Sequence, residues 1–421
     1  MMKHRHLPAP SRPLAITLAC LTLAACGAAV DDLGNVTPGG LGATTGRGLF
    51  RDSNVTGLGY RSGDTTGVTS AEDGAALAGE FTYEIGAGVT FFVGGVTLGT
   101  APEGSVITPV HLVANGNTGR TEVQNIARFL QMLDTNNNHD DGIVISPAVR
   151  SAAENWPQVN FLAGDLDAEL AAIMSDVASV DNRVPVLPTP LTAKTRLDAT
   201  LLCTYSGAFG GRFSDNSGLV GRYGFILNGR TGALSGHIYR EGSTVVIPIV
   251  GTTPLRFDGQ NLNAVSVTGR TSETDEFTFQ FSNLNQIDGN WQNLTTSQQG
   301  TFTGVRMNEA QTPIYLFVGT FAGDDTGVMS FGVLRDSAGD LNSINGEIYK
   351  ATIDELSNFN GRVIGLESAA IRTMDVTAGD VKNFVGNIDF NSLTVSGTWT
   401  QNISATVTQT GTYTATGCKL N

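Results

Sequence analysis

Two tandem copies of a pattern of about 110 residues fill the second half of the chain and most constrain how it can fold. Runs such as Phe277–Phe281 alternate apolar with polar residues, and several matched segments join a glycine to an aromatic residue. Alternation with a period of two is typical of half-buried antiparallel strands, so each copy is expected to form a β barrel or sandwich. By residue number, the matched segments are 211–218 with 319–327, 236–239 with 346–349, 288–293 with 396–402, and 300–304 with 411–415.

The remainder of the chain divides by its pattern. Short apolar runs broken by turn residues predict a small β module. Apolar residues at helical spacing predict three short helices after it, and three prolines near residue 188 predict a stiff linker. The fold class is therefore mainly β, with one helical segment. The predicted boundaries are 49–112 for the β module, 113–193 for the helical segment and linker, 194–308 for the first repeat, and 309–421 for the second.

The N-terminus carries a targeting signal. Basic residues precede a short apolar run, residues 14–25, which is too short to span a bilayer. The run ends in Leu23-Ala24-Ala25-Cys26-Gly27, which resembles the lipobox of bacterial lipoprotein signal peptides. The alternative is an ordinary signal peptide in which Cys26 is incidental.

The lipobox resemblance implies how the chain is processed and where in the cell it is located. It implies that residues 1–25 are removed and that Cys26 carries diacylglycerol and a further acyl chain such as palmitate. The segment that follows is rich in glycine and threonine and has little apolar content, which predicts a flexible tether over residues 26–48. Several acyl chains anchor a protein stably where a single chain does not. Because Gly27 rather than aspartate follows the lipidated cysteine, the resemblance implies an outer-membrane lipoprotein, facing either the periplasm or the cell surface. The body resembles poorly characterised Gram-negative envelope lipoproteins with tandem glycine-aromatic β-repeats.

Charge restricts the partners. Residues 1–25 hold three basic and no acidic residues, so the processed chain would have 22 Lys and Arg against 39 Asp and Glu, a net charge of −17. Such a surface disfavours nucleic acid and anionic lipid as partners. We expect the lipid anchor to contact the membrane and an unidentified protein or polysaccharide to be the partner.

Two cysteines remain after Cys20 leaves with the signal and Cys26 is lipidated. In an exported protein, Cys203 and Cys418 are expected to form a disulfide. The alternative is a pair of buried thiols. Since Cys203 opens the first repeat and Cys418 closes the second, a disulfide would make the repeats two halves of one closed or face-packed β unit.

A polar loop between the first two helices is the segment that most suggests a metal. Oxygen-bearing side chains alternate at Asp134, Asn136, Asn138 and Asp140, and alternate positions of a tight loop can converge on one cation. The loop resembles the calcium loops of EF-hand and dockerin-like proteins, which implies calcium as the cofactor. It departs from them at His139, where they have glycine, and at Ile145, where they have glutamate. The alternative is a polar connection between helices.

Catalytic motifs are absent from the sequence, which has no nucleophile elbow, zinc-protease motif, paired-cysteine motif or P-loop. No catalytic residue is therefore assigned. A carboxylate pair for glycoside hydrolysis stays open, since spacing in sequence does not give separation in space. The acids considered for it are Glu241, Asp258, Glu347 and Asp354.

The favoured function is a lipid-anchored, non-catalytic module for binding, adhesion or assembly at the cell envelope, stabilised by calcium. A scaffold rich in β structure and poor in pairs of nucleophile and base favours binding. Two alternatives remain open: a surface hydrolase that acts on a polymer, and a carrier of lipid or another small ligand inside a barrel.

Overall fold

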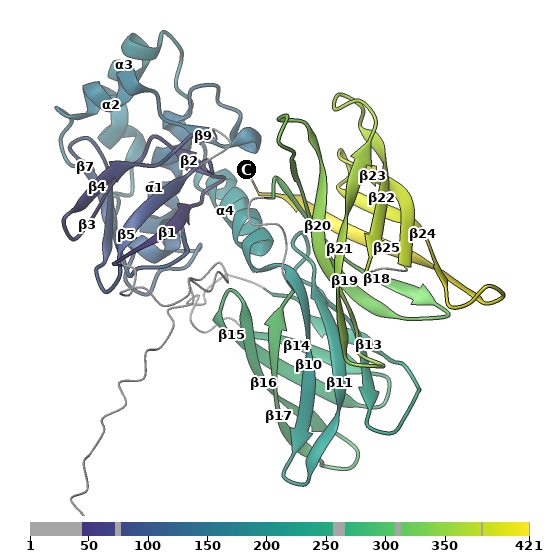
Figure 1. Ribbon diagram of the computed structural model, residues 1–421. Coiled ribbons are helices and arrows are strands. Elements are labelled where there is room, and N and C mark those ends of the chain that lie inside the picture. The colour runs from purple at the N-terminus through teal and green to yellow at the C-terminus, as the bar shows by residue number, and fades with distance from the viewer. Residues whose placement is uncertain (1–43, 72–76, 256–265, 308–312, 380–381, 421) are drawn as a thin grey trace, which may run out of the picture. The chain divides into compact units, whose positions relative to one another are not determined.

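The computed structural model describes residues 44–71, 77–255, 266–307, 313–379 and 382–420 (Figure 1). The predicted signal peptide, the predicted lipidation site Cys26 and most of the predicted tether therefore lie outside the described residues. The described chain is mainly β, as predicted, with a small N-terminal β module followed by two antiparallel barrels in tandem.

Short strands build the N-terminal module. They form a three-stranded sheet in the order β5-β1-β8, a four-stranded sheet in the order β4-β3-β6-β7, and the parallel pair β2 and β9. Their bounds are β1 Thr45–Phe50, β2 Val55–Thr56, β3 Gly59–Ser62, β4 Thr65–Val68, β5 Glu80–Glu84, β6 Val89–Val93, β7 Val96–Ala101, β8 Val106–Ile107 and β9 Ile143–Val144.

Helices complete this module. The apolar residues of α1 at helical spacing, such as Val123, Ile126 and Phe129, are fully buried in the module's core, which confirms the predicted amphipathic helix. Ser146 caps α2 by accepting a hydrogen bond from Val149 N, with Pro147 at the first helical position. The helices are η1 Pro109–Leu112, α1 Thr121–Leu133, η2 His139–Asp141, α2 Pro147–Ala153, α3 Leu166–Asp181 and α4 Pro190–Tyr205.

Helix α4 occupies the segment where the sequence predicted the end of a linker and the start of the first repeat. Pro190 stands at the first helical position, where its missing N–H is no loss, and the Thr189 hydroxyl accepts a hydrogen bond from Thr192 N. Leu197 and Leu201, four residues apart, are fully buried in the core. The first barrel consequently begins at Gly207, and Cys203 belongs to the helix.

Barrel 1 is an antiparallel meander of eight strands in which each strand pairs with the next. The last strand, β17, pairs with the first, β10, and closes the barrel. The strands are β10 Gly207–Asp215, β11 Gly218–Leu227, β12 Leu234–Arg240, β13 Ile247–Thr253, β14 Ser266–Thr271, β15 Asp275–Asn283, β16 Gln286–Asn293 and β17 Gln299–Arg306.

Barrel 2 repeats this topology and closes where β25 pairs with β18. Its strands are β18 Tyr315–Gly323, β19 Gly327–Arg335, β20 Leu341–Lys350, β21 Glu355–Ile364, β22 Ile371–Ala378, β23 Lys382–Asp389, β24 Thr394–Asn402 and β25 Thr408–Lys419.

Side chains fill both barrels. Successive residues of a strand point to opposite faces, so the alternating sequence places one set inside and the other in solvent. Along β22, for example, burial alternates strictly from exposed Ile371 to buried Ala378. Phe277 and Trp291 are buried inside barrel 1, and Phe384 and Trp399 inside barrel 2. Trp291 and Trp399, at matched positions of the two repeats, are therefore both core residues.

The predicted disulfide is present, but the prediction that it makes the two repeats halves of one β unit is wrong. Cys203 and Cys418 are bonded, with their Cα atoms 5.8 Å apart. Each repeat nevertheless closes on itself rather than forming half of one β unit. The disulfide joins α4, which precedes barrel 1, to the last strand of barrel 2. The sequence suggested otherwise because Cys203 was assigned to the start of the first repeat, whereas it lies in helix α4.

Candidate functional site

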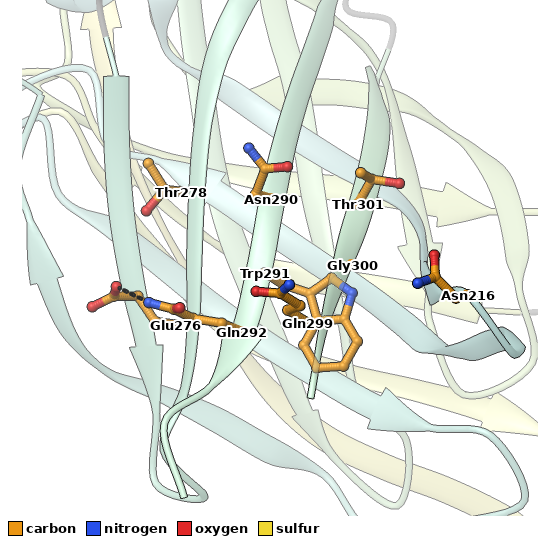
Figure 2. A pocket seen from close by; sticks show the side chains of 9 residues that line it. All are labelled: Asn216, Glu276, Thr278, Asn290, Trp291, Gln292, Gln299, Gly300 and Thr301. Carbon is orange, nitrogen blue, oxygen red and sulfur yellow. Dashed lines mark hydrogen bonds between the residues drawn. The ribbon is translucent and has the colours of Figure 1, made fainter. Parts of the chain in front are cut away.

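A polar recess of about 440 Å³ lies on the outer face of barrel 1. Three neighbouring strands and the turn after β10 form it (Figure 2). Its lining residues are Glu276 and Thr278 on β15, Asn290, Trp291 and Gln292 on β16, Gln299, Gly300 and Thr301 on β17, and Asn216 in the turn. A volume of this size is typical of small-ligand sites.

Strand alternation explains which side chains line the recess. Phe277 points into the barrel, so its neighbours Glu276 and Thr278 point outward. Trp291 also points inward, with only 1% of its surface exposed, and its neighbours Asn290 and Gln292 are exposed. The exposed polar side chains of three paired strands therefore lie side by side on one face.

Trp291 lies beneath the recess and is held rigidly. Its indole N–H donates a hydrogen bond to the carbonyl oxygen of Ser214, at 3.0 Å. The opposite residue, Gly300, makes room for this contact. A Cβ at position 300 would lie 1.8 Å from the Ser214 carbonyl oxygen and 2.8 Å from Trp291 Nε1. Only glycine fits there, because any side chain would collide with the backbone of β10.

Glu276 is the only ionisable residue among the nine that line the recess, and it is paired. Arg270 Nε donates to Glu276 Oε2 at 2.6 Å, and Gln292 Nε2 donates to Oε1 at 3.0 Å. The hydrogen bond from Arg270 lowers the pKa of the Glu276 carboxyl group. Glu276 is therefore suited to accept hydrogen bonds and to position Gln292, and it is not poised as a general acid.

The other lining groups are amides and hydroxyls. Amide side chains both donate and accept hydrogen bonds, and so do threonine hydroxyls. Such a surface can bind a ligand rich in hydroxyl groups through many neutral hydrogen bonds. None of the nine described lining residues is a cysteine, histidine or serine that could act as a nucleophile or a base.

Barrel 2 has different side chains at the corresponding positions. Trp399 pairs with Phe384 and Gly411 as Trp291 pairs with Phe277 and Gly300, which aligns the two faces. Threonines therefore replace the long amides of barrel 1. The aligned pairs are Glu276 with Asn383, Thr278 with Val385, Asn290 with Thr398, Gln292 with Thr400, Gln299 with Thr410, and Thr301 with Thr412.

The predicted calcium loop is held together by its own hydrogen bonds. Asp134 is fully buried at the end of α1, where its Oδ2 lies 3.1 Å from His139 Nδ1 and its Oδ1 accepts a hydrogen bond from Val144 N. The Asp134 carboxylate therefore connects both ends of the loop.

The asparagines of this loop turn toward a residue that the sequence did not single out. Asn136 Nδ2 and Asn138 Nδ2 both donate to Asp141, and Asn136 Oδ1 accepts a hydrogen bond from Asn138 N. The side chain of Asp140 is outside the described part of the structure. Among the described residues, no group of three or more His, Cys, Asp or Glu is arranged to hold a metal ion. Calcium at Asp134, Asn136, Asn138 and Asp140 stays a prediction.

The acids considered for hydrolysis lie on separate elements. Glu241 follows β12 and pairs with Arg222 at 3.4 Å, whereas Asp354 bonds to Arg212 and to the Tyr349 hydroxyl. Glu347 lies on β20, and Asp258 is outside the described residues.

The recess itself was missed at the level of sequence. Its residues span positions 216 to 301 and come together only when the strands pair. The available signal was the alternation of amides with aromatic residues around Trp291, which identifies a polar outer face but not a hollow one.

Comparison with known proteins adds no relative. Within the described residues, none of the helices has the length and apolar character needed to cross a membrane. No protein-family model matches this chain, and no curated protein matches it significantly.

Proposed function

We propose that this chain is a lipid-anchored, non-catalytic binding protein of the cell envelope, whose barrel 1 recess holds a neutral polysaccharide. The observation that carries the proposal is the cluster of amide and hydroxyl side chains over a rigid tryptophan, on the outside of a closed barrel. Cys26 would supply the anchor and residues 26–48 the tether.

The chemistry of the recess favours a glycan over a protein. Protein interfaces usually have a core of aromatic and other apolar residues and bury about 800 Å² on each partner. Here the lining is polar, Glu276 is its one charged group and is paired with Arg270, and Trp291 is buried. The hydroxyl groups of a sugar can donate hydrogen bonds to Asn290, Gln292 and Thr278 and accept hydrogen bonds from them. The chain's net negative charge favours a neutral polymer over an anionic one.

Because both barrel interiors are filled with side chains, the barrels are better suited to bind a ligand on their outer surface than to enclose one. Aromatic and aliphatic side chains occupy both interiors, and the recess lies outside them. Groups that are already fixed lose little conformational entropy when a ligand binds, so a rigid outer face is a favourable binding surface.

Binding of the full chain to a panel of neutral oligosaccharides (glucans, galactans and mannans) tests the proposal. We expect at least one to bind, and the double variant N290A/Q292A to bind it about thirtyfold more weakly, because two neutral hydrogen bonds of about 1 kcal/mol each are lost. The matched control is T398A/T400A, at the aligned positions of barrel 2. Equal affinity in N290A/Q292A and the unchanged chain would reject the recess as the site.

The anchor is tested in cells. Metabolic labelling with radioactive palmitate is expected to label the chain and to leave Cys26→Ala unlabelled. Labelling that survives this substitution would contradict the assignment of Cys26. Proteolysis of whole cells then distinguishes surface exposure from a periplasmic location.

A further inference from the structure

A second recess, of about 540 Å³, is bordered by the N-terminal module, α4 and both barrels. It lies apart from the polar recess and shares no residue with it. Its lining residues are Arg51 and Ser53, Arg196, Ala199, Thr200 and Cys203 of α4, Gly229 and Arg230 after β11, Tyr315, Phe390 and Leu393 of barrel 2, and Cys418, Lys419 and Leu420 at the end of β25.

The charge of this recess is opposite to that of the whole protein. Among the described residues that line it, four are basic, namely Arg51, Arg196, Arg230 and Lys419, and none is acidic. The whole chain, in contrast, has 39 acidic and 25 basic residues. A concave site lined by one sign of charge focuses the electric field and attracts ions of opposite charge.

Two of these arginines bond only to uncharged groups. Arg196 Nη1 donates to Gln131 Oε1 at 3.4 Å, and Arg230 Nη1 donates to the carbonyl oxygen of Ser392. Neither forms an ion pair within the described residues. Arg196 does act on the buried carboxyl group of Asp52, whose pKa burial raises to about 7.

A further positive charge adjoins the aromatic side of the recess. The rings of Tyr315 and Phe390 are in contact, with their centroids 5.0 Å apart. The guanidinium of Arg372 lies 5.6 Å from the centroid of Phe390, and this arginine is only 4% exposed. Its Nε and Nη1 are buried without a hydrogen-bond partner among the described residues. A buried guanidinium stays charged and is costly without a compensating anion nearby.

Covalent bonding fixes two sides of the recess relative to each other. The disulfide joins Cys203, on the helix that carries Arg196, to Cys418, beside Lys419. Basic groups from separate elements are therefore held around one space before any ligand arrives, which lowers the entropic cost of binding.

We propose that this recess binds a small organic anion. Its phosphate or carboxylate groups would lie against Arg196, Arg230 and Lys419, and its apolar part against Tyr315 and Phe390. Charge-assisted hydrogen bonds from arginine suit both kinds of oxyanion. This site is independent of the glycan recess, so either proposal can fail without the other.

Isothermal titration calorimetry of the full chain, freed of divalent ions, tests the proposal with pyrophosphate, citrate and uncharged sucrose. We expect one site for pyrophosphate or citrate, with an affinity that falls as sodium chloride is raised, and no heat from sucrose. Binding of one anion alone would identify phosphate or carboxylate as the preferred chemistry. No heat from either anion would overturn the proposal.

Substitutions then locate the site. R196Q/R230Q is expected to weaken anion binding about tenfold or more, and Arg230→Lys, which keeps the charge, is expected to weaken it less. Arg362→Gln, an exposed arginine of β21, is the matched control and is expected to change nothing. Since Arg230 is itself exposed, Arg230→Gln alone is expected to fold normally, as its thermal unfolding will show. Unchanged affinity in both R196Q/R230Q and Arg230→Gln would overturn the proposal.

Discussion

Barrel 1 and barrel 2 share the same strand topology and the same buried tryptophan, but they differ in the charged and polar side chains that they carry. In both, a buried tryptophan donates its indole N–H to the first strand, Trp291 to the Ser214 carbonyl at 3.0 Å and Trp399 to the Ala322 carbonyl at 3.2 Å. A glycine lies opposite each tryptophan. The same contact therefore joins the seventh strand to the first in both barrels.

At one equivalent position, the two barrels bury ionisable side chains of opposite charge. Two residues before Phe277, barrel 1 buries the acid Asp275, which accepts hydrogen bonds from Arg240 and Asn293. Two residues before Phe384, barrel 2 buries the base Lys382, which bonds to Asp325. This position therefore accepts either charge where another segment of the same barrel supplies the opposite one, Arg240 of β12 in barrel 1 and Asp325 in the turn before β19 in barrel 2.

Removing the disulfide is expected to have the largest effect. C203S/C418S should lower the free energy of unfolding by about 4 kcal/mol, since the bond closes a loop of more than 200 residues in the unfolded chain. Urea denaturation followed by tryptophan fluorescence measures it. Separate reporters, Trp291 in a W156F/W399F background and Trp399 in a W156F/W291F background, would show whether the two barrels then unfold independently. A loss below 1 kcal/mol would contradict the expectation.

Removing the buried acid of barrel 1 comes next. Asp275→Ala is expected to cost about 3 kcal/mol, because it removes a buried carboxylate that accepts hydrogen bonds from Arg240, Thr271 and Asn293. The loss should be seen through Trp291 in urea denaturation. Asp275→Asn, which keeps one acceptor oxygen, is the matched control and should cost less. If the two variants behave alike, the charge of Asp275 is not what matters.

Removing the buried base of barrel 2 is expected to lower the free energy of unfolding by less. Lys382 Nζ lies 4.6 Å from the Trp399 ring centroid and 5.1 Å from that of Phe321, and burial lowers its pKa although Asp325 acts in the opposite sense. Lys382→Met removes the partner of Asp325 and the contact of the cation with the two rings, which should lower the free energy of unfolding. Because methionine keeps an apolar stem and no charge has to be buried, we expect this loss to be only about 2 kcal/mol, measured through Trp399. A larger loss than in Asp275→Ala would reverse the ranking of the two barrels.

A pH-dependent difference is the smallest expected effect. His237 of barrel 1 aligns with Glu347 of barrel 2, and burial lowers its pKa to about 4, with Asp325 acting in the opposite sense. Between pH 4 and 6.5 the unfolded chain binds more protons at this residue than the folded chain, so its contribution to stability is present above pH 6.5 and is lost as the pH falls.

His237→Gln removes this dependence. Relative to the variant, the unchanged chain is expected to lose about 1 kcal/mol between pH 8 and pH 6, and more below that. Urea denaturation at several pH values, followed through Trp291, measures the difference. Parallel pH profiles for the two chains would mean that His237 is not buried in its neutral form.

The repeat and the strands could be predicted from the sequence because they depend on local pattern. The alternation from Phe277 to Phe281 identifies a half-buried strand without knowledge of its neighbours. Closure could not be predicted, since it depends on β10 meeting β17 across about 90 residues. Helix α4 was missed because Pro190 was interpreted as a linker residue, although proline is equally suited to begin a helix.

The candidate site was less predictable than the fold. Cys203 and Cys418 could be paired from cysteine counting, and the structure confirms the disulfide. Both recesses depend instead on which segments become neighbours. Arg196 and Arg230, for example, are unremarkable in sequence, and only the folded chain brings them to one space.

We propose that barrel 1, and not barrel 2, binds a glycan through its outer face. Fluorine NMR of the full chain labelled with 5-fluorotryptophan tests it most directly, with the signals assigned by W156F, W291F and W399F. Titration with the best-binding neutral oligosaccharide should shift the Trp291 signal, which arises from beneath the recess, and leave that of Trp399 unchanged. A shift of Trp399 without Trp291 would contradict the account.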